Sequence, residues 1–118
     1  MKLRIKGNSI RLRLLRSEVE RFASDGRISD EINFGKNSLR YSLLASDTGA
    51  IHANIEIGEI TVAVPKDLAS QWTTTDQVGI EAEQRLNGDD TLSILIEKDF
   101  ACVGRPDDPD HADAFPAP

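Results

Sequence analysis

Hydrophobic and polar residues alternate near the start of the chain. Ile10, Leu12 and Leu14 are apolar, and Arg11 and Arg13 lie between them. Residues two apart share one face of a β-strand, so the leucines and the arginines lie on opposite faces. The preceding residues 7–9, Gly-Asn-Ser, are typical of a turn. We therefore predict strands over 2–6 and 10–14, joined by a tight turn, with a basic outer face.

A second stretch, residues 55–64, repeats this apolar pattern fifty residues later. The repeat continues beyond the strand, and after an insertion at 87–90 it resumes in the last strand. The aligned pairs are Ile10 with Ile60, Leu12 with Val62, Leu14 with Val64, Phe22 with Trp72, Ile28 with Val78, Leu39 with Leu92, Tyr41 with Ile94, and Leu43 with Ile96. The chain is predicted to be a tandem duplication of a strand–strand–helix–strand–strand unit, about 2–46 and 51–98.

Cap and turn signals place the other elements. Residues 17–20, Ser-Glu-Val-Glu, have the Ser-x-x-Glu form that begins a helix, which Gly26 ends. Pro65 is suited to open the second helix, over 66–72, because a proline there loses no hydrogen bond. Two hairpins complete the copies, with strands over 28–34 and 39–44 and over 77–86 and 91–98.

These elements predict an α+β fold that is mostly β. We expect a single domain over 1–98, an internally duplicated, pseudo-two-fold β-barrel with two short helices. Phe22 and Trp72 are expected to be core residues of this barrel. Residues 99–118 form an acidic, Pro- and Asp-rich tail, extended or disordered by itself, which Phe100 and Phe115 are suited to dock onto the barrel.

Charge is distributed unevenly along the 118 residues. The net charge is −6, yet residues 1–27 hold eight Lys or Arg against three acidic residues, a local charge of +5 that leaves −11 for the rest. A local basic patch can steer acidic partners despite a negative total. No apolar run is long enough to span a bilayer, and the single cysteine, Cys102, fits a reducing compartment. We expect a cytoplasmic protein with no membrane partner.

The order of these motifs resembles the swapped-hairpin domain of AbrB-type regulators and MazE-type antitoxins. The first copy has the Gly-Asn-Ser turn and a strand ending Arg-Leu-Leu at 13–15, and the second has Val-Pro-Lys-Asp-Leu at 64–68 followed by Asp-Gln-Val at 76–78. The resemblance covers roughly residues 3–98. The whole chain also looks like small uncharacterised bacterial proteins that open with a similar Lys-Gly-Asn-Ser stretch and close near Glu-Lys-Asp-Phe.

In that family two chains interlock their hairpins, so the resemblance implies a barrel made by one chain as a pseudo-dimer, or a homodimer. It also implies a bacterial regulator that contacts duplex DNA with the turn and the neighbouring basic residues. The implied site residues are Arg4, Lys6, Asn8, Ser9, Arg11 and Arg13. The equivalent positions of the second copy lack these cations, so half of a symmetric DNA-binding face remains.

Other interpretations of the same residues stay open. The basic strand pair also fits a solvated edge hairpin, whose charges block strand-to-strand aggregation, or a face covered by the acidic tail. The tail also fits a segment that binds a protein partner, which would make the chain a protein–protein interaction module without nucleic acid contact. A small-ligand-binding barrel or an enzyme is a third class.

We expect neither catalysis nor a cofactor. Glu81 and Glu83 alternate with apolar Ile80 and Ala82, so they fit a solvated strand face. The sequence has no Gly-rich phosphate loop. A metal site at Cys102 and His111, with Asp110 or Asp113, lacks the paired spacing of zinc ligands. The carboxylates considered are Glu31, Glu56, Glu59, Glu81 and Glu83.

Overall fold

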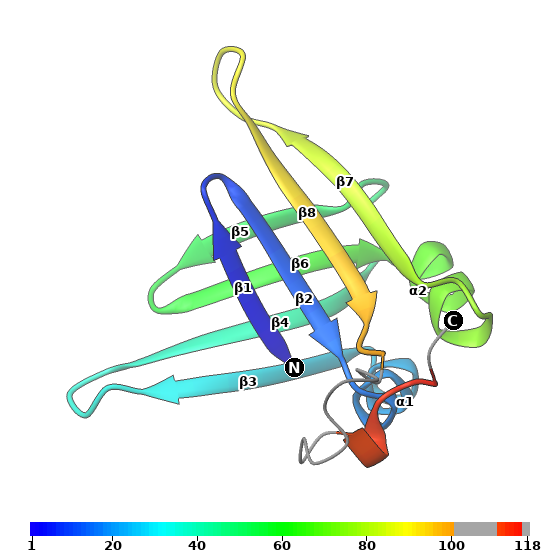
Figure 1. Ribbon diagram of the computed structural model, residues 1–118. Coiled ribbons are helices and arrows are strands. Elements are labelled where there is room, and N and C mark those ends of the chain that lie inside the picture. Colours follow the sequence, from blue (N-terminus) through cyan, green and yellow to red (C-terminus); the bar gives the residue numbers. More distant parts are fainter. Residues whose placement is uncertain (101–110, 117–118) are drawn as a thin grey trace.

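The computed structural model describes residues 1–100 and 111–116. Its eight strands form two four-stranded sheets that face each other, with strands of one sheet crossing those of the other (Figure 1). The strands are β1 (Lys2–Lys6), β2 (Ser9–Leu14), β3 (Arg27–Asn33), β4 (Ser38–Ser46), β5 (His52–Glu56), β6 (Glu59–Pro65), β7 (Gly79–Arg85) and β8 (Thr91–Lys98). The helices are α1 (Arg16–Asp25) and α2 (Lys66–Thr74), and residues His111–Asp113 make a 3₁₀ turn. The predicted mostly-β fold with two helices is confirmed.

The two sheets have the same layout. Sheet one has the order β1-β2-β8-β7 and sheet two the order β5-β6-β4-β3. In each sheet the two central strands are parallel, and each outer strand is antiparallel to its neighbour. Each sheet thus takes one hairpin from the first half of the chain and one from the second.

The core lies between the sheets and ends at the two helices. Alternate residues of β2 and β6 point inward, so Leu12, Leu14 and Val64 are almost fully buried. Phe22 of α1 and Trp72 of α2 are buried together, with ring centroids 6.3 Å apart. These two rings fill the helical end of the core, as their matched positions predict.

The expected barrel is wrong, because no backbone ladder closes the sheets within the described residues. The edge strands β5 and β7 are joined by a side chain: the Gln84 amide accepts from the Ala53 N–H at 2.7 Å and donates to the Ala53 carbonyl at 3.2 Å. Between the sheets, the hydroxyl of Tyr41 on the central strand β4 donates to the Met1 carbonyl at 2.9 Å. Individual side chains therefore bridge the two sheets at these places.

The C-terminal residues 111–116 lie beside the start of α1 and the end of β8 (Figure 1). Phe115 makes a bridge with Phe100, and its N–H donates to the Asp99 carbonyl at 2.8 Å. The expectation that Phe100 and Phe115 dock this segment is confirmed. The acidic and proline-rich stretch at 101–110 lies outside the described residues.

Candidate functional site: a charged sheet face

All of the predicted binding residues except Asn8 belong to the outer face of sheet one or its edge. The alternation in β2 turns Ile10, Leu12 and Leu14 inward, which leaves Arg11 and Arg13 on the outside. The strand register places residues of β1, β8 and β7 on the same side. We call this outer face the charged face; its members are Lys2, Arg4, Lys6, Ser9, Arg11, Arg13, Gly79, Glu81, Glu83, Arg85, Thr91, Ser93, Leu95 and Glu97.

The charged face is basic on one half and acidic on the other. Strands β1 and β2 supply the cations of the basic half. Strands β7 and β8 supply Glu81, Glu83 and Glu97, with Arg85 at the far end of β7. Neighbouring strands lie about 4.8 Å apart, so the outermost cations and acids are separated by about 14 Å across the sheet. This division exists because β2 pairs with β8, a strand about eighty residues later in the chain.

Two of the predicted cations are engaged within the chain. The Arg13 Nε lies 3.2 Å from a Glu97 carboxylate oxygen, and the Arg11 Nε lies 3.5 Å from the same oxygen. Arg13 also lies 3.7 Å from Asp99, whose other oxygen accepts from Lys2 Nζ at 2.8 Å. Arg11 and Arg13 are therefore partly neutralised in the folded protein.

Of the predicted cations, Arg4 and Lys6 remain available to a partner. Both are exposed on the edge strand β1, next to the hairpin turn, and neither makes an ion pair within residues 1–100 and 111–116. The turn between β1 and β2 has Gly7 at φ +54°, a backbone conformation that glycine adopts without strain. The tip of this hairpin therefore presents positive charge to solvent.

Asn8 and Ser9 serve the turn itself. The Asn8 side-chain amide donates to the Thr91 carbonyl, and the Asn8 carbonyl accepts from the Ser93 N–H at 3.1 Å. The Ser9 hydroxyl donates to the Lys6 carbonyl at 2.6 Å. These bonds tie the β1–β2 tip to β8 and hold the hairpin in place.

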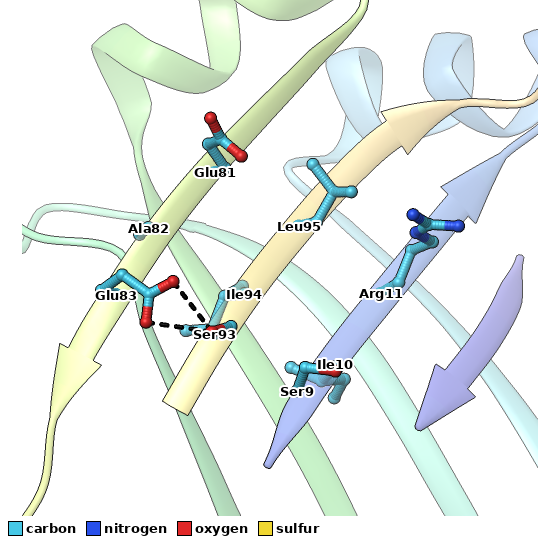
Figure 2. Close-up of a pocket in the computed structure, with 9 residues that line it drawn as sticks. All are labelled: Ser9, Ile10, Arg11, Glu81, Ala82, Glu83, Ser93, Ile94 and Leu95. Carbon is cyan, nitrogen blue, oxygen red and sulfur yellow. Dashed lines mark hydrogen bonds between the residues drawn. The ribbon is translucent and has the colours of Figure 1, made fainter. Parts of the chain in front are cut away.

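A trough runs along β8 between the two halves of the charged face. Figure 2 shows Arg11 on one side of it, Glu81 and Glu83 on the other, and Leu95 and Ser93 between them. Its volume is about 560 Å³. The Ser93 hydroxyl lies 2.8 and 2.9 Å from the two Glu83 carboxylate oxygens, which orients Glu83 along the trough.

The sequence places Glu81 and Glu83 on a solvated strand face, and the structure confirms their outward position. What strand pairing adds is that this face continues into the basic hairpin. Alternation with a period of two shows which residues of a strand share a face, but it does not show which strand lies beside it.

The carboxylates on sheet two lie in structural contacts. Glu59 accepts from the Arg27 guanidinium at 3.1 Å and from the buried Ser42 hydroxyl at 2.8 Å. Glu31 pairs with Arg40 at 3.3 Å, and hydrogen bonds from Ser38 and Arg40 lower the pKa of Glu31. These acids hold strands together through ion pairs, and Glu56 is simply exposed.

A second hollow opens between the sheets, at the hairpin tips of β1 and β5. Its volume is about 420 Å³, and its walls are mainly apolar. Of the three amide side chains on its wall, those of Gln84 and Asn8 are bonded to backbone carbonyl groups, and the third belongs to Asn54. The hollow therefore offers mainly apolar surface, and two of its three amide side chains are engaged in hydrogen bonds.

The described part of the chain contains no cluster of three or more His, Cys, Asp or Glu residues able to hold a metal ion. Cys102 and Asp110 lie outside the described residues, and the Asp113 carboxylate accepts from Ser17 at the start of α1. Of the two helices in residues 1–100 and the turn at 111–113, none combines the length and apolar character that crossing a bilayer requires.

Comparison with known proteins yields a family model that matches residues 1–118 and describes a family of unknown function. No curated protein matches the chain. No solved structure matches it either.

Proposed function

From the premise that the chain belongs to DUF7009, a family of unknown function, we propose that it is a non-catalytic binding protein whose basic β1–β2 hairpin takes an acidic partner. The observation that carries this proposal is the pair Arg4 and Lys6. Both are exposed beside the turn, and both lack an ion pair in the described part of the chain. Exposed cations held on a rigid strand favour electrostatic association.

The partner that fits best is a protein with an acidic segment. A short acidic segment can lie along the two available cations of β1 without crossing the rest of the face. A long phosphate backbone would run over Glu81 and Glu83, which repel it, and Arg11 and Arg13 already have carboxylate neighbours. The geometry therefore favours a protein partner over nucleic acid.

Duplex DNA is the second candidate, supported by the projecting hairpin tip with Arg4 and Lys6 on its edge. With two cations available, about two phosphates would be neutralised. The logarithm of the DNA affinity would then fall with the logarithm of the salt concentration with a slope of about −2.

The test is fluorescence anisotropy with two labelled probes, a polyglutamate peptide and a duplex DNA, at low and moderate salt. We expect the peptide to bind, and the double variant Arg4→Glu with Lys6→Glu to bind it about tenfold more weakly or worse. The matched control is Arg21→Glu with Lys36→Glu, which changes the net charge equally at exposed sites on α1 and the β3–β4 loop.

Equal losses in both double variants would show binding to net charge alone and would contradict the assigned site. Binding of DNA with a slope near −2, without peptide binding, would replace the protein partner by nucleic acid. No binding of either probe at low salt would overturn the proposal.

We further propose that the chain is an internally duplicated relative of the swapped-hairpin regulators, working in the bacterial cytoplasm. The shared layout of the sheets supports this, because each sheet combines a first hairpin of one half with a second hairpin of the other half. The contact of Phe22 with Trp72 at the junction of the halves also supports it. The single cysteine fits a reducing compartment.

A further inference from the structure

We propose that the charged face is a self-association surface, on which a second copy of this chain docks about a two-fold axis parallel to β2. The inference goes beyond the proposed function, because it gives the acidic half of the face a role as well as the basic half. It commits to one occupant on the ground of charge complementarity.

The charges on the face are arranged in rows that cross all four strands. A row consists of residues that are paired across the sheet, from β1 to β2, from β2 to β8 and from β8 to β7. Two of these rows start with a cation on β1 and end with an acid on β7. The two rows are Arg4, Arg11, Leu95, Glu81 and Lys6, Ser9, Ser93, Glu83.

A two-fold axis that lies in the interface and runs along the strands reverses each row and keeps its level. Arg4 of one copy then faces Glu81 of the second copy, and Lys6 faces Glu83. The symmetry repeats both contacts, as an isologous interface requires. An axis across the strands would instead place cations over cations, so the charges select one orientation.

The third row shows why the outermost charges are the ones left for a partner. In it Arg13 and Glu97 are adjacent and paired within the chain, and Arg11 shares the same carboxylate. Glu83 accepts from Ser93, a neutral group, so its negative charge is not compensated there. Leu95, half-buried at the middle of the face, lies near the proposed axis.

Face-to-face sheets pack about 10 Å apart, a gap that Arg and Lys side chains can cross to reach a carboxylate. An acidic peptide would satisfy only the basic half and leave Glu81 and Glu83 unpaired. Exposed ion pairs each contribute little and are screened by salt. We therefore expect a weak dimer that forms at high protein concentration and low salt, and that covers Arg4 and Lys6 when it forms.

Charge exchange between the two halves tests this arrangement by sedimentation velocity at low salt. One variant carries Arg4→Glu and Lys6→Glu, and the other carries Glu81→Lys and Glu83→Lys. We expect the wild type to self-associate and each variant alone to sediment as a monomer. An equimolar mixture of the two variants should regain the dimer, because every opposed pair is again of opposite sign.

The matched control for the Glu81→Lys and Glu83→Lys variant is Glu20→Lys with Glu56→Lys. It raises the net charge equally, at exposed positions on α1 and sheet two. It should associate at least as well as the wild type. Recovery in the mixture also demonstrates that both exchanged variants are folded.

A wild type that stays monomeric at all concentrations would overturn the inference, and so would a mixture that fails to associate while the wild type dimerises. The anisotropy test, run at low micromolar protein, reports separately. Recovered dimer without probe binding leaves this inference standing and removes the proposed function. Probe binding that depends on Arg4 and Lys6, with no dimer, does the reverse.

Discussion

The residues of the basic hairpin show how far a single side chain can be interpreted from the sequence. Alternation places Arg11 and Arg13 on the outer face, and the structure confirms it. The same pattern cannot tell that Glu97 lies beside both of them, because Glu97 belongs to a strand far along the chain. Whether a cation is available to a partner is therefore a property of its neighbours in space.

Lys98 is a residue that the sequence interpretation missed. It continues the inward alternation of Ile94 and Ile96, and it is buried, with 5% of its surface exposed. Its ammonium group donates to the Thr75 carbonyl at 2.7 Å and lies 5.9 Å from the Trp72 ring and 5.5 Å from the Phe115 ring. The period of two was the signal that could have identified it.

Burial lowers the pKa of Lys98 from its ordinary 10.5, with Asp76 opposing the shift. The unfolded chain then binds this proton more readily, so between the lowered pKa and about 10.5 the Lys98 contribution to stability increases with pH. Lys98→Met should remove that increase. Urea unfolding of the wild type and the variant at several pH values from 7 to 10.5 is the measurement. The difference between their free energies of unfolding should change with pH.

Other titrating groups, including Tyr41, whose burial raises its pKa, affect both proteins alike and cancel in that difference. A stability difference that stays constant with pH would contradict the assignment to Lys98.

At the scale of elements, the start of α1 corrects the predicted cap. The helix begins at Arg16, and the Glu18 carboxylate accepts from the Leu15 N–H at 2.8 Å, so the expected cap of Ser17 with Glu20 is wrong. Ser17 instead donates its N–H to Asp113 at 3.1 Å, and its hydroxyl donates to the same carboxylate. The C-terminal segment therefore supplies a carboxylate to the positive end of α1.

Asp113→Ala should lower the free energy of unfolding by about 1 kcal/mol, the usual effect of losing a carboxylate at a helix start. Guanidinium unfolding measures it. Asp25→Ala, at the opposite end of α1, is the control and should cost nothing, because an acid is unfavourable there. Ser17→Ala with Asp113→Ala should cost less than the two single changes added together; strict additivity would show that the contact carries no energy.

The later strands show the limit of aligning the two halves. Ile28 is the second residue of β3 and is buried, and its predicted counterpart Val78 is 45% exposed. Ile80, the second residue of β7, takes the corresponding buried place. Apolar residues two apart are equally good candidates for one inward position, and strand pairing decides between them.

At the scale of the whole molecule, side chains rather than a closed ladder join the sheet edges. Gln84 uses both ends of its amide on Ala53, which takes the place of a strand-to-strand contact between β7 and β5. A sequence offers no reason to treat this glutamine differently from other polar strand residues. The open edges therefore became visible only in the assembled sheets.

Gln84→Ala should destabilise the protein by about 1–3 kcal/mol, because both polar groups of Ala53 lose their partner. Hydrogen exchange at the Ala53 amide should accelerate more than exchange in β2, whose ladder is untouched. Gln71→Ala, an exposed change on α2, is the control. Unchanged exchange at Ala53 would mean that the Gln84 bridge does not hold this edge.

The sequence by itself determined the local structure: which segments are strands and helices, where glycine turns them, and which residues of a strand face inward. These features depend on spacing along the chain and on backbone chemistry. Only the tertiary structure decided that β2 lies beside β8, that basic and acidic strands share one face, and that the sheets do not close. These features depend on contacts between segments far apart in the sequence, and a two-residue period within one strand does not determine such contacts.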